Sequence, residues 1–306
     1  MFARLFAAGV LALAGCAPAP VADAPTRLPG LASFADWQAQ CAGAGSGREA
    51  WTAPAPPFRV FGNTYYVGTC GIAALLVTSA DGNVLLDTGM AQAAPLVRAN
   101  IERLGYPVTS VKALLSSHEH LDHVGATAEL RRLSGGETVA LRGAVKPLET
   151  GKPYPQDPQA AMIPPFDGFP IDKVIEDADT FRLGSLTFTG HSTPSHTPGS
   201  TSWTWQSCEG DKCLTIAYAD SLSTPAAEGY RFADHPDYVA QVRRGFEVVA
   251  DLPCDILMTP HPGASDMAER FGGKMAIVDP VGCKHYAHTS AARFEQLLAS
   301  QSGSSK

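Results

Sequence analysis

Four side chains of types that bind metal ions lie within six positions of one another, at His118, His120, Asp122 and His123. Imidazole nitrogens and carboxylate oxygens are ligands that zinc accepts. In extended backbone His118 and His120 point to one side, whereas the adjacent Asp122 and His123 point to different sides unless the loop turns. A turning loop could therefore hold two ions, one on each pair. A solvated histidine-rich loop is the alternative, but a buried strand would not normally end in four side chains of this kind.

The elements around this cluster must position it. The apolar run 111–115 predicts a strand that stops just before the cluster, and residues 126–133 predict a helix after it. Other β-rich runs predict strands over 65–67, 72–78, 84–87, 180–182, 186–189, 202–205, 214–218 and 256–258. Helical spacing of apolar residues predicts helices over 91–104, 238–250 and 291–300. Both halves run strands, helix, strand, helix, which favours two packed sheets with helices outside over one parallel sheet.

Residues 146–170 are rich in proline and poor in aliphatic side chains, which predicts a long loop. Two interpretations stay open. The loop could form one wall of a cleft through Tyr154, Phe166 and Phe169, or it could be a plain surface loop.

The histidine cluster resembles the His-x-His-x-Asp-His signature of the metallo-β-lactamase superfamily. Three other segments resemble motifs of that superfamily: 81–89 its early strand and Asp-x-Gly turn, 193–200 its third histidine motif, and 259–263 its last histidine motif. The match runs from about residue 58 to about residue 290. The resemblance implies an α/β fold, a four-layer αββα sandwich with the active site at one edge of the two central sheets.

The resemblance also implies two Zn²⁺ ions per chain. The first would be held by His118, His120 and His196, and the second by Asp122, His123 and His261. Asp87 is expected to support the metal loop as a structural acid. Glu119 is expected to face solvent or a basic group and to have no catalytic role. The other histidines have no metal-spaced neighbour and are expected at the surface or behind the ligands: His191, His235, His285 and His288.

The region around Asp220 separates the members of this superfamily. In thioester hydrolases of the glyoxalase II kind an aspartate here bridges both metals, and in the first two lactamase subclasses a cysteine here binds the second metal. This chain has Asp220, Ser221, Leu222 and Ser223, with no cysteine, and resembles the third (B3) subclass. In that subclass the serines contact the substrate carboxylate, so Ser221 and Ser223 are the substrate-binding candidates. A bridging role for Asp220 stays open.

The resemblance therefore implies a class B, subclass B3 β-lactamase that confers antibiotic resistance. A hydroxide held by two zinc ions and oriented by Asp122 would open the β-lactam amide of penicillins, cephalosporins and carbapenems. Two alternatives remain. One is another di-zinc hydrolase of the superfamily, either a glyoxalase II-like thioesterase or a lactonase. The other is a non-catalytic zinc-binding lipoprotein.

Composition limits the partners. The chain has 306 residues and a formal net charge of −7, which argues against a nucleic-acid partner because such partners need a basic surface. No protein partner is evident, and a monomer acting on a small-molecule β-lactam is expected.

The N-terminus predicts export. Residues 1–15 combine a basic start with an apolar run too short to span a bilayer, which is typical of a signal peptide. The run ends in a segment that resembles a bacterial lipobox, with Cys16 as the lipidated residue; a plain signal peptide is the alternative. Residues 16–57 are expected to be a linker and irregular arm, and residues 58–306 the catalytic domain. The protein is expected in the periplasm, with lipid on Cys16 as a possible anchor to the outer membrane.

Seven cysteines leave six once Cys16 is set aside, and an even set in an exported chain predicts disulfides. Among the 15 pairings that six cysteines allow, Cys208 with Cys213 is the most local. The resemblance to the B3 subclass implies three pairs: Cys41–Cys70, Cys208–Cys213 and Cys254–Cys283.

Overall fold

The structure, a computed structural model, describes residues 30–45 and 47–303. The predicted signal peptide and Cys16 lie outside these residues. Within them, no helix combines the length and apolar character that crossing a membrane requires.

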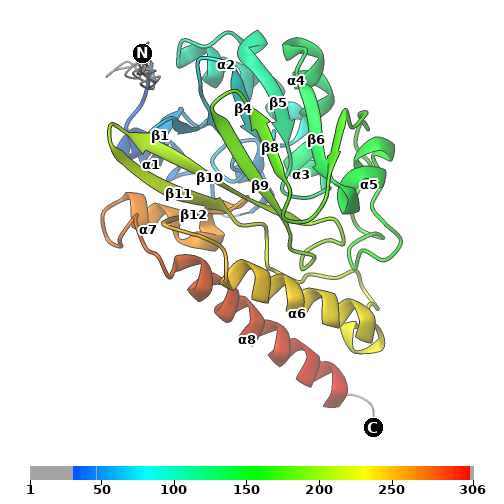
Figure 1. Ribbon diagram of the computed structural model, residues 1–306. Coiled ribbons are helices and arrows are strands. Elements are labelled where there is room, and N and C mark those ends of the chain that lie inside the picture. The colour runs from blue at the N-terminus through cyan, green and yellow to red at the C-terminus, as the bar shows by residue number, and fades with distance from the viewer. Residues whose placement is uncertain (1–29, 46, 304–306) are drawn as a thin grey trace, which may run out of the picture.

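Two β-sheets form the centre of the molecule (Figure 1). The first has seven strands in chain order: β1 (Phe58–Phe61), β2 (Thr64–Tyr66), β3 (Leu75–Val77), β4 (Asn83–Leu86), β5 (Val111–Leu115), β6 (Glu137–Leu141) and β7 (Lys173–Ile175). The second has the order β12 (Ile256–Met258), β11 (Lys212–Tyr218), β10 (Thr201–Glu209), β9 (Leu186–Ser192) and β8 (Thr180–Leu183). Strands β4 to β7 run parallel, and so do β11 and β12.

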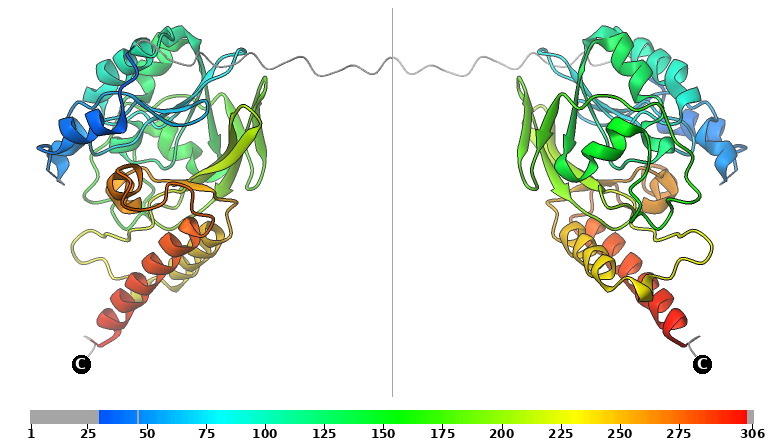
Figure 2. Two further views of the ribbon diagram at one scale, coloured as in Figure 1. Left: turned by 90° about the vertical axis from the view of Figure 1, so that its left-hand side faces the viewer. Right: turned by 90° about the vertical axis from the view of Figure 1, so that its right-hand side faces the viewer.

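Helices flank the two sheets. They are α1 (Phe34–Cys41), α2 (Ala94–Arg103), α3 (Leu121–Val124), α4 (Thr127–Ser134), α5 (Val145–Thr150), α6 (Pro236–Ala250), α7 (Met267–Phe271) and α8 (Gly282–Gly303). Figure 2 shows α2 and α4 on one side of the sheets and α6 with α8 on the other. The predicted four-layer αββα sandwich is therefore confirmed.

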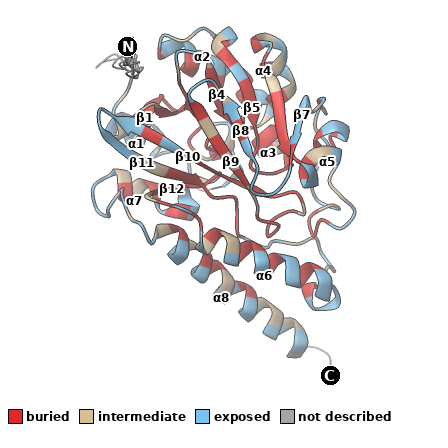
Figure 3. Cartoon of the chain, in the orientation of Figure 1, coloured by how far each residue is buried: buried red, intermediate tan, exposed pale blue. Residues whose placement is uncertain are grey.

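The alternation of side chains along the strands explains these layers. In β3, Leu75 and Val77 face inward and pack in the cluster that also contains Trp203 of the second sheet. Leu76 lies between them and faces outward, where it packs with Ile101 of α2. The central strands, buried on both faces, are shown in red in Figure 3.

The N-terminal arm is more regular than the sequence analysis expected. Helix α1 lies within it and begins with a capping box, in which Ser33 and Asp36 bond each other's backbone N–H groups. Trp37 of this helix is buried, and its ring makes edge contacts with the rings of Phe58 and Tyr66. The expectation of an irregular arm was wrong here, because an eight-residue helix with one buried side chain has too little apolar periodicity to be recognised.

Three disulfides join the six cysteines in the pairs that the resemblance implied: Cys41–Cys70, Cys208–Cys213 and Cys254–Cys283. The first fixes α1 to the segment after β2. The second lies across the paired strands β10 and β11. The third fixes the residue two positions before β12 to the first turn of α8.

Candidate metal centre

Strand ends bring the predicted site residues to one edge of the two sheets. Asp87 follows β4, and His118 comes three residues after β5, its parallel neighbour. Asp220 follows β11, and His261 follows β12, which is again a parallel neighbour. Because the carboxyl ends of parallel strands lie at the same edge, residues far apart in sequence meet there. His196 comes from the loop between β9 and β10.

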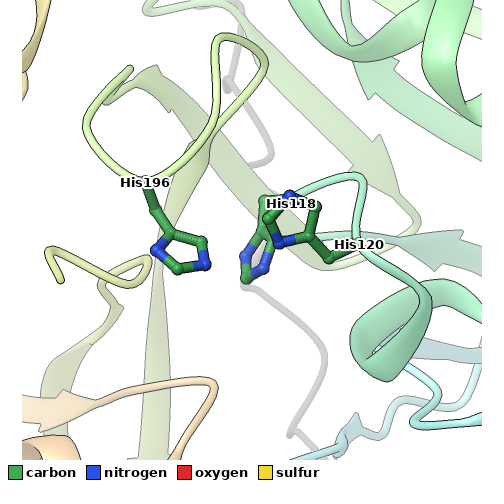
Figure 4. A group of neighbouring side chains, drawn as sticks. All are labelled: His118, His120 and His196. Atoms are coloured by element: carbon green, nitrogen blue, oxygen red, sulfur yellow. The ribbon is translucent and has the colours of Figure 1, made fainter. Parts of the chain in front are cut away.

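The first predicted ligand set forms a compact cluster. His118, His120 and His196 are buried, and each offers one ring nitrogen within 4.8 Å of those of the others. In Figure 4 the rings of His118 and His120 face the ring of His196, which comes from the opposite loop. Burial lowers the pKa of His196 to about 3 and that of His118 well below its usual value, and the neighbouring imidazoles add to this. Both rings are therefore neutral at pH 7, as metal ligands must be.

A polar partner holds the outer nitrogen of each ring. Nδ1 of His118 lies 2.7 Å from Oδ1 of Asp220, and Nδ1 of His196 lies 2.8 Å from the carbonyl oxygen of Ser223. Such contacts fix the tautomer with the proton on Nδ1 and make Nε2 of each ring the nitrogen that carries a lone pair. Within the described residues, the buried Nε2 of His118 has no hydrogen-bond partner. A bound cation would satisfy this otherwise costly orphaned atom.

The ring of His120 is oriented the other way round, with Nε2 and not Nδ1 facing its supporting residue. Its Nε2 lies 2.8 Å from Oδ2 of Asp157, so Nδ1 is the nitrogen that faces the cluster. Asp157 is buried, and its other oxygen accepts a hydrogen bond from the backbone N–H of Gln159. The Gln159 amide nitrogen lies 3.3 Å from Nε2 of His196. The loop after α5 thus reaches the site.

The sequence left open whether this loop borders the site, and it did not indicate the two residues that contact the histidines. Asp157 and Gln159 lie in a stretch without periodicity, 37 positions from the histidines they contact. Phe166 and Phe169, which were candidates for a cleft wall in one of the two interpretations, pack with Leu148 in a small core cluster, and Tyr154 is half-buried. The start of the range 146–170 is part of helix α5.

The second predicted ligand set meets beside the first. Nε2 of His123 and Nε2 of His261 lie 3.3 and 3.4 Å from Oδ2 of Asp122, and 3.3 Å from each other. On the far side of its ring, Nδ1 of His123 lies 3.2 Å from Oδ2 of Asp87. Burial alone would raise the pKa of Asp122, but the adjacent imidazoles of His123 and His261 lower it well below its usual value. Two ring nitrogens and a carboxylate oxygen thus converge as a cation would require.

Asp87 has the supporting place expected for it. Its carboxylate accepts hydrogen bonds from the backbone N–H and the hydroxyl of Ser117, both at 2.7 Å, and from the hydroxyl of Tyr218 at 2.8 Å. It is fully buried and has a positive φ of 54°. Asp87 therefore joins the end of β4 to the loop that carries the histidine cluster.

The expectation for Glu119 was wrong. Its side chain is only 1% exposed, and its carboxylate accepts hydrogen bonds from the hydroxyl of Thr197 and the N–H of Gly199. Burial raises the pKa of Glu119 to about 7, although the bond from Thr197 opposes this shift. Side-chain alternation places Glu119 opposite His118 and His120, but the loop carrying His196 covers that face.

Ser221 and Ser223 line a cavity of about 550 Å³ that also reaches His261. The hydroxyl of Ser223 lies 3.3 Å from Nδ1 of His196. Of the four histidines outside the ligand sets, His191 bonds Thr204, His235 stacks on Tyr230, His285 lines the same cavity, and His288 is exposed.

Comparison with known proteins gives a consistent result. The family model described as "Metallo-beta-lactamase superfamily" matches residues 67–209. A "probable metallo-hydrolase" of Burkholderia pseudomallei (strain 1710b) is 33% identical over 143 residues, which are 42% of this chain and 46% of that protein. The match thus spans about half the length of this curated relative.

Solved structures match over a larger share of the chain. The metallo-β-lactamase MIM-1 from Novosphingobium pentaromativorans is 47% identical, with a TM-score of 0.87, over 89% of this chain and 99% of that one. MEM-A1, a subclass B3 metallo-β-lactamase from a soil metagenome library, is 37% identical, with a TM-score of 0.77, over 83% and 99%. The fold, the arrangement of histidines and these matches establish that the chain belongs to the metallo-β-lactamase superfamily.

Proposed function

We propose that this protein is a subclass B3 β-lactamase that binds two zinc ions and hydrolyses the amide of penicillins, cephalosporins and carbapenems. One observation carries the proposal: five buried or half-buried imidazoles and one carboxylate converge, and the outer nitrogens of four of those rings are held by polar partners. Relatives at 37–47% identity that are named as metallo-β-lactamases support the substrate class.

The donor set suits zinc, which takes neutral imidazole and carboxylate ligands. His118, His120 and His196 would hold one ion, and Asp122, His123 and His261 the other. When bound, zinc supplies the Lewis acidity that polarises the lactam carbonyl and lowers the pKa of water toward about 7.

The chain's own residues position the reactants. Asp122 lies between the two histidine sets, where its carboxylate can accept a hydrogen bond from the attacking water and orient it. Ser221 and Ser223 face the neighbouring cavity, where their hydroxyls can donate to the substrate carboxylate. Asp220, Asp157 and Asp87 hold three of the imidazoles in their metal-binding orientation.

The proposal also covers the domain organisation and the cellular location of the protein. Residues 1–15 act as a signal peptide, residues 16–57 as a linker and arm, and residues 58–306 as the catalytic domain. The protein works as a monomer in the periplasm, with lipid on Cys16 as the anchor to the outer membrane. There it would meet a β-lactam before the antibiotic reaches cell-wall enzymes.

A hydrolysis panel tests the proposed function. Purified, zinc-loaded protein is given a penicillin, a cephalosporin, a carbapenem, a thioester and a lactone, with and without a chelator. We expect turnover of the three β-lactams, loss of turnover on chelation, and recovery on adding zinc. Turnover of only the thioester or the lactone would favour another hydrolase of the superfamily, and zinc uptake without any turnover would favour a binding protein.

A matched pair of variants ties turnover to the site. Asp122→Asn should lower kcat by at least a hundredfold, since it removes the charge that orients the water. Asp211→Asn makes the same chemical change at an exposed position in the turn between β10 and β11 and should leave kcat unchanged.

A further inference from the structure

The cavity beside the metal centre extends well beyond the two predicted substrate serines. From Ser221, Ser223 and His261 it runs between α7 and the first half of α8. Its volume of about 550 Å³ lies in the range of small-molecule sites. It is therefore large enough to take a substituent of a substrate whose reactive ring lies at the metals.

One wall of this cavity carries charged groups of both signs. Arg270 of α7 is buried and donates hydrogen bonds to the carbonyl oxygen of Ser265 at 2.7 Å and to its hydroxyl at 3.0 Å. Burial lowers the pKa of Arg270, and the carboxylates of Asp266 and Asp279 oppose that shift, so both acids lie close to it. One cation therefore faces two carboxylates, so this wall is net negative and an anionic group of a ligand would avoid it.

The opposite wall, on α8, has free polar groups. Residues at spacings of three and four along a helix share one face, and on α8 that face carries Tyr286, Ser290 and Arg293, with Thr289 beside them. Within the part of the chain that the structure describes, neither the guanidinium of Arg293 nor the hydroxyls of Thr289 and Ser290 form a hydrogen bond or an ion pair. Arg293 is thus a cation of this lining that has no ion-pair partner among the described residues.

Tyr286 joins this wall directly to the predicted substrate serines. The backbone N–H of Leu222 donates to the Tyr286 hydroxyl at 3.0 Å, and that hydroxyl lies 3.3 Å from the carbonyl oxygen of Asp220. Arg293 lies seven residues further along the helix, or about 10 Å at a rise of about 1.5 Å per residue. A long substituent on a β-lactam whose ring carboxylate is held by the serines would extend along this wall toward Arg293.

We propose that this cavity is a second substrate subsite, which takes an anionic substituent on the carboxylate-bearing ring of the β-lactam, with Arg293 as its counter-ion. The inference rests on the proposed β-lactamase function and adds a preference among substrates. Thr289 and Ser290 supply hydroxyl groups that hydrogen-bond the substituent, and Tyr286 fixes the end of this wall beside the serines.

Two cephalosporins that differ in one group provide the test. One carries a carboxylate at the end of its C3 substituent, and the other a neutral amide of the same size. We expect the wild-type protein to have a KM about fivefold lower for the anionic compound, the effect of a partly exposed ion pair. Raising the ionic strength to about 1 M, where the screening length is about 3 Å, should remove this difference.

Substitutions on α8 test whether Arg293 causes the difference in KM. Arg293→Met should raise KM for the anionic cephalosporin to that of the neutral one and leave kcat for both unchanged, whereas Arg293→Lys should keep part of the preference. Lys284→Met removes a cation from the same helix outside the cavity and should change neither KM.

Failure of the subsite is distinguishable from failure of the proposed function. Turnover of both compounds with equal KM overturns the subsite alone, as does an equal change of both KM values in Arg293→Met. If the wild-type protein hydrolyses neither compound, the β-lactamase function fails and the subsite falls with it.

Discussion

The hydroxyl of Thr197 donates a 2.7 Å hydrogen bond to the carboxylate of Glu119, which stands between two of the proposed metal ligands. The second carboxylate oxygen accepts from the N–H of Gly199 at 2.9 Å. A Cβ at position 199 would lie 2.7 Å from both Glu119 oxygens, so only glycine allows this approach. Glu119 thus fixes the loop that carries His196 against the loop that carries His118 and His120.

Replacing Glu119 should weaken zinc binding, although Glu119 is not itself a proposed metal ligand. Glu119→Ala leaves the buried N–H of Gly199 unpaired and frees the His196 loop, and we expect a fall in zinc affinity of about tenfold. Glu119→Gln keeps one carbonyl acceptor and should lose less. Competition with a chromogenic chelator measures the affinity, and thermal unfolding monitors the fold. Glu129→Ala, at an exposed ion pair on α4, is the control, and an unchanged zinc affinity in Glu119→Ala would refute the positioning role.

The role of Asp220 can be tested by counting the zinc ions that its variants bind. Its Oδ1 contacts the outer nitrogen of His118, which suits an orienting rather than a bridging carboxylate. Asp220→Asn keeps an acceptor for that nitrogen and should still bind two zinc ions, whereas Asp220→Ala should lose about tenfold in affinity. Metal analysis of the purified variants gives the count. Loss of one ion per chain in Asp220→Asn would identify a bridge and favour the glyoxalase-like alternative.

The disulfides should contribute unequally to stability. Cys254–Cys283 closes a sequence separation of 29 residues and Cys208–Cys213 one of 5. Because the entropy removed from the unfolded chain grows with loop length, replacing both cysteines of a pair by alanine should cost about 3–4 kcal/mol for the first and about 2 kcal/mol for the second. Urea unfolding measures both free energies. A larger loss at Cys208–Cys213 would show that native-state packing, and not loop closure, dominates.

Metal removal should lower the melting temperature. A ligand present at a thousandfold excess over its Kd stabilises the native state by about 4 kcal/mol, which is roughly 10 °C for a domain of this size. Thermal unfolding with and without a chelator measures the shift, and added zinc should reverse it. A variant with His118→Ala and His261→Ala should shift much less. Equal melting temperatures in both conditions would contradict coupling between this site and the fold.

Local patterns in the sequence predicted the elements whose apolar residues are periodic. Strands β5 and β12 have the bounds 111–115 and 256–258 that the apolar runs indicated. Helix α8 begins at Gly282, although helical spacing was recognised only from 291, because Lys284, His285 and His288 of its first turns are exposed and give no apolar stripe.

The residues that hold the proposed metal ligands in place were harder to predict than the metal ligands themselves. A spaced motif identifies His118, His120 and His123 because the ligands of one loop are close in sequence. Asp157 contacts His120 from a loop without periodicity, and Glu119 is buried only because the segment 193–200 folds over it. Both facts depend on tertiary packing, which a local pattern does not contain.

The carbonyl oxygen of Ser223, and not mainly its side chain, holds Nδ1 of His196: the carbonyl lies at 2.8 Å and the hydroxyl at 3.3 Å. Any amino acid at this position supplies that carbonyl, while its side chain faces the substrate cavity. Under the proposed function, substitution at position 223 can therefore alter substrate recognition while His196 keeps its partner. For an enzyme with that function, the range of antibiotics hydrolysed can drift by single substitutions there while the residues that hold the metals stay intact.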